Sequence, residues 1–111
     1  MRIRVMVMSG PDDGREISLQ VNQRFDGQLE SPDGFSIGRR ETCDICIPYD
    51  TSVSRLHAHL QLRDGELWLV DEDSRNGTFV GRTQVKEAMP LAVGELFRVG
   101  NTWLRVQTLQ E

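Results

Sequence analysis

The feature that most limits how this chain can fold is an alternation of apolar and polar residues with a period of two. In residues 1–7 every second residue is Met, Ile or Val, and arginines stand between the first three of them. Residues 16–21 and 58–63 repeat the pattern. A β-strand with one buried face and one hydrated face requires this spacing, whereas a helix requires a period near 3.6. The chain is therefore expected to consist mainly of strands.

Turn residues separate these runs. Asp64-Gly65 lies between residues 60–63 and 66–70, which predicts a tight hairpin, and residues 9–14 and Asn76-Gly77 are further turn signals. Four consecutive apolar residues at 67–70 predict a strand buried on both faces, and residues 102–109 predict a last strand. No stretch combines helical periodicity with a capping box. We predict one all-β domain over residues 1–111, a sandwich or a barrel.

Composition excludes several classes of protein. No apolar run approaches the roughly 18–20 residues that span a bilayer. The net charge of −4 disfavours nucleic acid and anionic membranes as partners. Two cysteines are too few for the disulfide framework of a small secreted protein, and the N-terminus does not resemble a signal peptide. We therefore expect a cytoplasmic protein.

The positive charge is carried almost entirely by arginine, with twelve arginines against one lysine. Codon usage or thermal adaptation could explain the total, so position is more informative than number. Arg39, Arg40, Arg55 and Arg75 all stand beside turn residues. A guanidinium can donate two parallel hydrogen bonds to one phosphate, which an ammonium cannot do in the same way. Loops that present these arginines together would form an anion site.

Three short clusters concentrate hydrogen-bond donors in expected loops. They are Gly38-Arg39, Ser54-Arg55-Leu56-His57 and Ser74-Arg75-Asn76-Gly77-Thr78. None of the three contains a carboxylate that could neutralise its arginine. Donor-rich loops on a rigid sheet scaffold are the usual construction of an anion site.

In order and spacing, the clusters resemble the forkhead-associated (FHA) domain family. The resemblance also includes residues 43–45, the run 53–58, and Asp71 ahead of residues 74–81, and it extends from about Phe35 to Gly100. It implies a two-sheet sandwich of about eleven strands, similar to FHA and SMAD domains, whose loops at one end bind a phosphothreonine peptide. It implies no cofactor, no metal and no catalysis. The implied partner is a Ser/Thr kinase or its substrate.

The resemblance also implies roles for five ligand residues. Arg39 is expected to contact the phosphate, Ser54 to donate its hydroxyl to a phosphate oxygen, and Arg55 to reach the phosphate or the neighbouring peptide. Asn76 is expected to hydrogen-bond the peptide main chain. Many members of the family have threonine where this chain has Arg75. The role of Arg75 is therefore open between a phosphate contact and the reading of nearby residues.

Four further residues are expected to support the site rather than to touch the ligand. They are Gly38, His57, Gly77 and Thr78. Glycine permits backbone angles that a side chain forbids, and a buried histidine is usually satisfied by hydrogen bonds within the protein. We expect His57 to brace the loops.

Two chemical alternatives remain at this point. Ser54, His57 and either Asp71 or Asp73 could form a hydrolytic triad, although no Gly-x-Ser-x-Gly elbow is present. Cys43 and Cys46, with His57 and His59, could bind zinc, although a single residue between the histidines is unlike the usual spacing. His59 shares the polar side of its strand and is expected to be exposed to solvent.

A third alternative keeps the fold and changes the function. A domain of this kind could act as a phosphate-independent docking or oligomerisation module. The presence of Arg39, Ser54 and Asn76 favours phosphopeptide recognition instead. A related hypothesis is that Arg40, Arg55 or Arg82 selects acidic residues around the phosphosite.

Overall fold

The computed structural model describes residues 1–21 and 34–110, which form eleven strands in two sheets and contain no helix. The predicted all-β sandwich is therefore confirmed. In this part of the chain no helix is long and apolar enough to cross a membrane. The strands are β1 (Arg2–Val7), β2 (Glu16–Gln20), β3 (Phe35–Gly38), β4 (Ile45–Cys46), β5 (Ala58–Arg63), β6 (Glu66–Asp71), β7 (Thr78–Val80), β8 (Thr83–Gln84), β9 (Ala88–Pro90), β10 (Leu96–Val99) and β11 (Thr102–Gln110).

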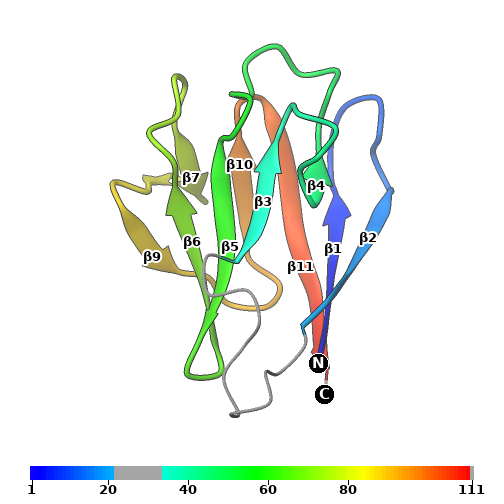
Figure 1. Ribbon diagram of the computed structural model, residues 1–111, viewed down its shortest axis with the longest axis vertical. Coiled ribbons are helices and arrows are strands. Elements are labelled where there is room, and N and C mark those ends of the chain that lie inside the picture. Colours follow the sequence, from blue (N-terminus) through cyan, green and yellow to red (C-terminus); the bar gives the residue numbers. More distant parts are fainter. Residues whose placement is uncertain (22–33, 111) are drawn as a thin grey trace.

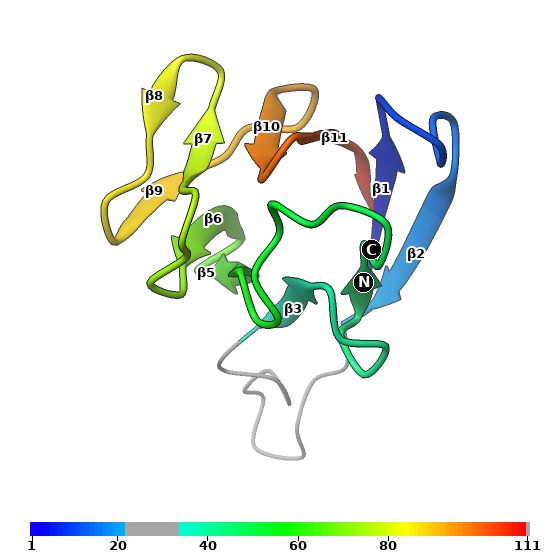
Figure 2. The same cartoon turned by 90° about the horizontal axis from the view of Figure 1, so that it is seen from above.

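The two sheets face each other across a shared interior (Figures 1 and 2). One sheet has the order β2-β1-β11-β10-β7-β8, and the other has the order β4-β3-β5-β6-β9. Every pair is antiparallel except β3 with β4. Strand β1 pairs along its whole length with β11, so the two ends of the described chain meet at one end of the sandwich (Figure 1).

The alternating runs produce the core, as the period of two predicts. Strand β1 buries Val5 and Val7, and β11 buries their partners Val106 and Leu104 opposite them. Among the described residues, Phe97 of β10 is the largest fully buried side chain. Each such side chain contributes about 1.5–3 kcal/mol through the area it removes from water. Contacts between the two inner faces therefore hold the sheets together.

The hairpin between β5 and β6 is confirmed, but the burial expected for β6 is wrong. Asp64 and Gly65 both have positive φ, 50° and 80°, which is the backbone of a type I′ turn. Leu67 and Leu69 are buried, whereas Trp68 and Val70 are only half-buried on the outer face. The guanidinium of Arg63 lies 5.0 Å from the centre of the Trp68 ring and covers part of it. From the sequence alone, an apolar residue that faces outward under an arginine cannot be distinguished from a residue of the core.

The segment between β4 and β5 leaves one sheet, reaches the other and returns, so that it crosses one end of the sandwich (Figure 2). The Asp50 carboxylate fixes it there, since it accepts hydrogen bonds from the Asn101 backbone N–H (2.9 Å), the Thr102 hydroxyl (2.7 Å) and the Ser52 backbone N–H (2.9 Å). A side chain at Gly100, where φ is 57°, would collide with the Ser52 backbone. The crossing segment is therefore tied to the turn between β10 and β11.

Candidate anion-binding groove

The loop after β3 runs beside the loop before β5. Arg39 donates its backbone N–H to the Ser54 carbonyl at 3.1 Å, and Arg40 donates to the Arg55 carbonyl at 3.3 Å. Gly38 permits this approach, because any side chain there would collide with the Arg55 carbonyl. The first and second donor clusters of the sequence are thus adjacent.

Arg39 is anchored at one atom and open at the others. Its Nε donates to the Val53 carbonyl at 2.7 Å. Within the described residues, its two terminal nitrogens form no hydrogen bond or ion pair. The anchor limits the motion of the guanidinium and leaves its outer donors for a ligand.

His57 joins this part of the site to the loop between β6 and β7. The imidazole is fully buried, and its Nδ1 lies 2.9 Å from the Ser54 backbone nitrogen, which is a donor. Nδ1 must therefore accept, so the proton is on Nε2, which donates to the Gly77 carbonyl at 2.9 Å. Burial lowers the pKa of His57 below its usual value and favours this neutral form.

The loop between β6 and β7 is organised by Asp71. Its carboxylate accepts hydrogen bonds from the backbone N–H (3.2 Å) and hydroxyl (2.5 Å) of Ser74 and from the Thr78 hydroxyl (2.7 Å). The Ser74 hydroxyl in turn accepts from the Gly77 backbone N–H at 3.1 Å. Gly77 has φ of 87°, a backbone conformation that favours glycine.

Neither Asp50 nor Asp71 was expected from the sequence to anchor a loop. Asp71 carries a local signal, since an aspartate three residues before a serine often closes a turn by bonding to the backbone ahead of it. The long-range partners of Asp50 leave no such signal. Thr51 and Ser52 also lie in the site, and neither belongs to the three donor clusters.

Two contacts dock the β6–β7 loop against the crossing segment. The Ser54 hydroxyl accepts from the Arg75 backbone N–H at 3.1 Å, and the Asn76 side-chain amide donates to the Ser52 carbonyl at 2.8 Å. Ser54 is therefore next to Arg39 through one loop and next to Arg75 through another. All three donor clusters converge on this serine.

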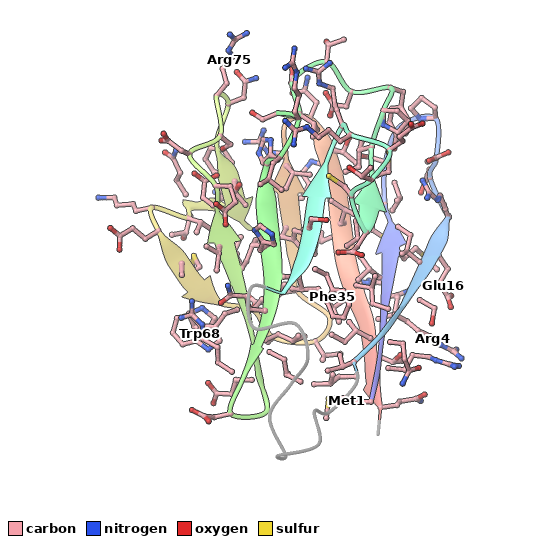
Figure 3. All side chains as sticks on the ribbon, viewed as in Figure 1. Met1, Arg4, Glu16, Phe35, Trp68 and Arg75 are labelled. Atoms are coloured by element: carbon pink, nitrogen blue, oxygen red, sulfur yellow. The ribbon has the colours of Figure 1, made fainter. Side chains whose placement is uncertain are left out.

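The convergence creates an open groove of about 500 Å³ at one end of the sandwich. All five residues expected to bind the ligand contribute to its lining, which consists of Arg39, Thr51, Ser52, Val53, Ser54, Arg55, Leu56, Arg75 and Asn76. Arg75 lies at the tip of its loop with its side chain directed away from the strands (Figure 3). Arg82 does not line the groove, because it follows β7 at the end of that strand remote from Thr78.

The groove is electropositive because its guanidiniums have no carboxylate partners. The ion pairs among the described residues are Arg4 with Glu16 and Arg15 with Asp12, and the His59 ring is bonded to the Glu72 carboxylate. None of them involves the groove. Several unpaired guanidiniums, a serine hydroxyl and an amide on rigid loops can bind a multiply charged oxyanion.

The hydrolytic alternative does not match this geometry. The His57 ring faces the backbone N–H of Ser54 rather than its hydroxyl, and its other nitrogen is bonded to Gly77. No ring nitrogen is left to accept the proton of the Ser54 hydroxyl, which a serine nucleophile requires.

The zinc alternative also lacks converging ligands. The thiols of Cys43 and Cys46 lie 3.5 and 3.7 Å from the carbonyl oxygens of Arg55 and Arg39, and both ring nitrogens of His57 are engaged. His59 is not freely exposed as expected, since its Nδ1 lies 2.7 Å from a carboxylate oxygen of Glu72. Across residues 1–21 and 34–110, no group of three or more histidine, cysteine, aspartate or glutamate side chains is arranged to hold a metal ion.

The fold and the groove define a β-sandwich domain whose loops form a groove lined by unpaired guanidiniums at one end. Within that class, the family model of the FHA domain matches residues 35–100, which is more than half of the chain. The chain belongs to the FHA domain family, as the sequence motifs suggested.

Relatives and solved structures agree with this assignment. The glycogen accumulation regulator GarA of Mycolicibacterium smegmatis is 43% identical over 65 residues, which are 59% of this chain and 40% of GarA. The matched segment thus spans about two fifths of that relative. A structure from an analysis of phosphothreonine-dependent FHA domain interactions has a TM-score of 0.75 and 26% identity, covering 100% of both chains. The FhaA FHA domain, solved with the intracellular domain of Rv3910, has a TM-score of 0.71 and 27% identity over 95% of this chain and 99% of that one.

Proposed function

We propose that this FHA domain binds a phosphothreonine-containing segment of another protein in the groove between its loops. The observation that carries the proposal is the convergence of Arg39, Ser54, Arg55 and Asn76 on one open groove without a neutralising carboxylate. A phosphothreonine brings about −1.5 to −2 charges and three acceptor oxygens. A similar fold solved in work on phosphothreonine-dependent interactions supports the same ligand.

The contacts within the protein suit the proposed roles. The Ser54 hydroxyl already accepts one hydrogen bond, so its own proton is free to be donated to a phosphate oxygen. The amide nitrogen of Asn76 is bonded to Ser52, which leaves its oxygen to accept a peptide N–H. Leu56, an exposed apolar residue of the lining, adds apolar surface that suits the methyl group of threonine.

The energy of these contacts corresponds to a useful affinity for signalling. Each charge-assisted hydrogen bond contributes about 1.5–3 kcal/mol. Two or three such bonds, together with main-chain contacts, are sufficient for micromolar binding, about −8 kcal/mol. Transient recognition of a kinase or a kinase substrate needs no tighter binding.

The proposed role is recognition in Ser/Thr kinase signalling, in the cytoplasm and without catalysis. The relatives named as regulators or as an oxoglutarate dehydrogenase inhibitor support a binding role. Free thiols at Cys43 and Cys46 suit a reducing compartment. His57 is not placed to act as a base for Ser54, which supports a role without hydrolysis.

Fluorescence polarisation with one peptide in three forms tests the proposal. We expect micromolar binding of the phosphothreonine form, and weaker binding of the phosphoserine and unmodified forms. Arg39→Ala should weaken binding by about 30-fold or more, or about 2 kcal/mol. Arg82→Ala removes the same charge outside the groove and should have little effect. Equal binding of all three forms would contradict the proposal and favour phosphate-independent docking.

A further inference from the structure

The groove carries more positive charge than one phosphothreonine neutralises. Three guanidiniums line it, those of Arg39, Arg55 and Arg75, and Arg40 stands in the adjoining loop. A phosphothreonine brings only about −1.5 to −2 charges. If Arg39 and Arg55 serve the phosphate, the charge of Arg75 remains unmatched.

Carboxylates of the protein do not remove this surplus. Those of Asp50 and Asp71 are occupied by hydroxyl and backbone N–H donors below the groove. Glu41 and Asp73 are exposed in neighbouring loops, and neither forms an ion pair within the part of the chain that the structure describes. The complementary charge must therefore come from the ligand.

Arg75 is placed to contact a negatively charged group of the ligand. Its backbone N–H is fixed to the Ser54 hydroxyl, so its side chain begins beside the proposed phosphate contact. The side chain extends from the loop tip into solvent (Figure 3). Neighbouring residues of an extended peptide are spaced about 3.3–3.6 Å apart, so side chains one or two positions from the phosphothreonine are within about 7 Å of it along the chain.

We propose that the groove selects phosphothreonine segments with acidic side chains one or two positions from the phosphothreonine, and that Arg75 reads them. This inference rests on the proposed function. It makes Arg75 a specificity-determining residue, since a neutral flank would leave its guanidinium without a partner in the complex. A requirement for acidic flanks would narrow the range of partners.

A set of matched peptides tests the inference. Each peptide carries one phosphothreonine, and the residues one and two positions to either side are Asp/Glu, Asn/Gln or Lys. We expect the best acidic peptide to bind about tenfold more tightly than its Asn/Gln counterpart, or about 1.4 kcal/mol. The Lys peptide should bind most weakly, and the differences should shrink as salt screens the charges.

Two variants of Arg75 test whether this residue causes the preference for acidic flanks. Arg75→Ala and Arg75→Gln should reduce the ratio of acidic to neutral affinity about threefold or more, whereas Arg82→Ala, with the same loss of charge, should leave the ratio unchanged. Two Arg75 variants protect the test against a folding defect in one of them, which circular dichroism would detect.

The outcomes separate the two proposals. Phosphate-dependent binding with equal affinity for acidic and neutral flanks would overturn the inference and leave the proposed function intact. An equal effect of the Arg75 and Arg82 variants would overturn the role of Arg75. Loss of the difference between phosphorylated and unmodified peptides would instead contradict the proposed function.

Discussion

The imidazole of His57 has no access to solvent and serves two loops at once. Its Nδ1 accepts from the Ser54 backbone and its Nε2 donates to the Gly77 carbonyl, each at 2.9 Å. Only the neutral ring with its proton on Nε2 satisfies both partners. A second proton on Nδ1 would oppose the Ser54 N–H, so protonation and the native loop arrangement compete.

This competition predicts a pH dependence of stability. The pKa of His57 in the folded state is lowered by burial below the ordinary value of 6.5, which applies to the unfolded chain. The unfolded state therefore binds the proton first. The contribution of neutral His57 to the free energy of unfolding is complete above about pH 6.5, and it is lost as the pH falls through the lower pKa of the folded state.

Urea unfolding at several pH values between about 8 and 5 checks this, with His57→Gln as the comparison. The unfolding free energy of the natural sequence should fall more steeply below about pH 6.5 than that of the variant. The variant should be less stable at every pH. Parallel curves would show that His57 does not titrate as described.

Gly38 allows the two arginine loops to touch. Gly38→Ala should destabilise the domain by about 1–3 kcal/mol, because a methyl group would force the Arg55 carbonyl away. It should also weaken phosphopeptide binding, since Arg39 and Arg55 would separate. Gly65→Ala is the control. The added methyl group would strain the backbone, where φ is 80°, but beyond its chain neighbours it would meet no atom within 4 Å. Unchanged affinity of the Gly38 variant, measured by fluorescence polarisation, would contradict this role.

At the scale of elements, the β6–β7 loop depends on one carboxylate. Asp71→Ala removes the acceptor of three hydrogen bonds, two from Ser74 and one from Thr78. We expect a loss of about 1.5–3 kcal/mol of stability in thermal or urea unfolding, and weaker phosphopeptide binding because the loop carries Asn76. Asp13→Ala removes an equal charge from an exposed turn and should change neither quantity. If the Asp71 variant kept full affinity, the loop would be positioned by other contacts.

The strands were largely predictable because their alternation is local. Strands β1, β5 and β11 and the turn at Asp64-Gly65 follow directly from period and turn residues. The error at residues 67–70 arose because Trp68 is apolar yet faces outward under Arg63. The bond between His59 and Glu72 joins residues 13 apart, and a pattern of single residues does not reveal such a pair.

The candidate site was predictable only in part. Each donor cluster is short and carries its own turn residues, so the ligand candidates could be named from the sequence. Their convergence on Ser54 depends on Asp50, which contacts residues about fifty positions away. Such an anchor is visible only when the chain is folded.

For the whole molecule, net charge and local charge make opposite predictions. The chain carries −4 and should repel an anionic peptide, whereas the groove is positive and should attract it. Charges separated by more than about 8 Å are largely screened at physiological salt, so the groove should dominate. Phosphopeptide affinity should then fall roughly threefold or more between about 50 and 300 mM NaCl in titration calorimetry. An affinity that rises with salt would mean that the net charge governs binding.

The most direct test of phosphothreonine recognition is a map of amide chemical shifts during titration with a phosphothreonine peptide. The NMR spectrum should change at the backbone amides of Arg39, Ser54, Arg55 and Asn76, and not at the distant hairpin turn of Asp64 and Gly65. The unmodified peptide should cause no such changes. Shifts confined to another surface, or equal shifts with both peptides, would contradict recognition of phosphothreonine by this groove.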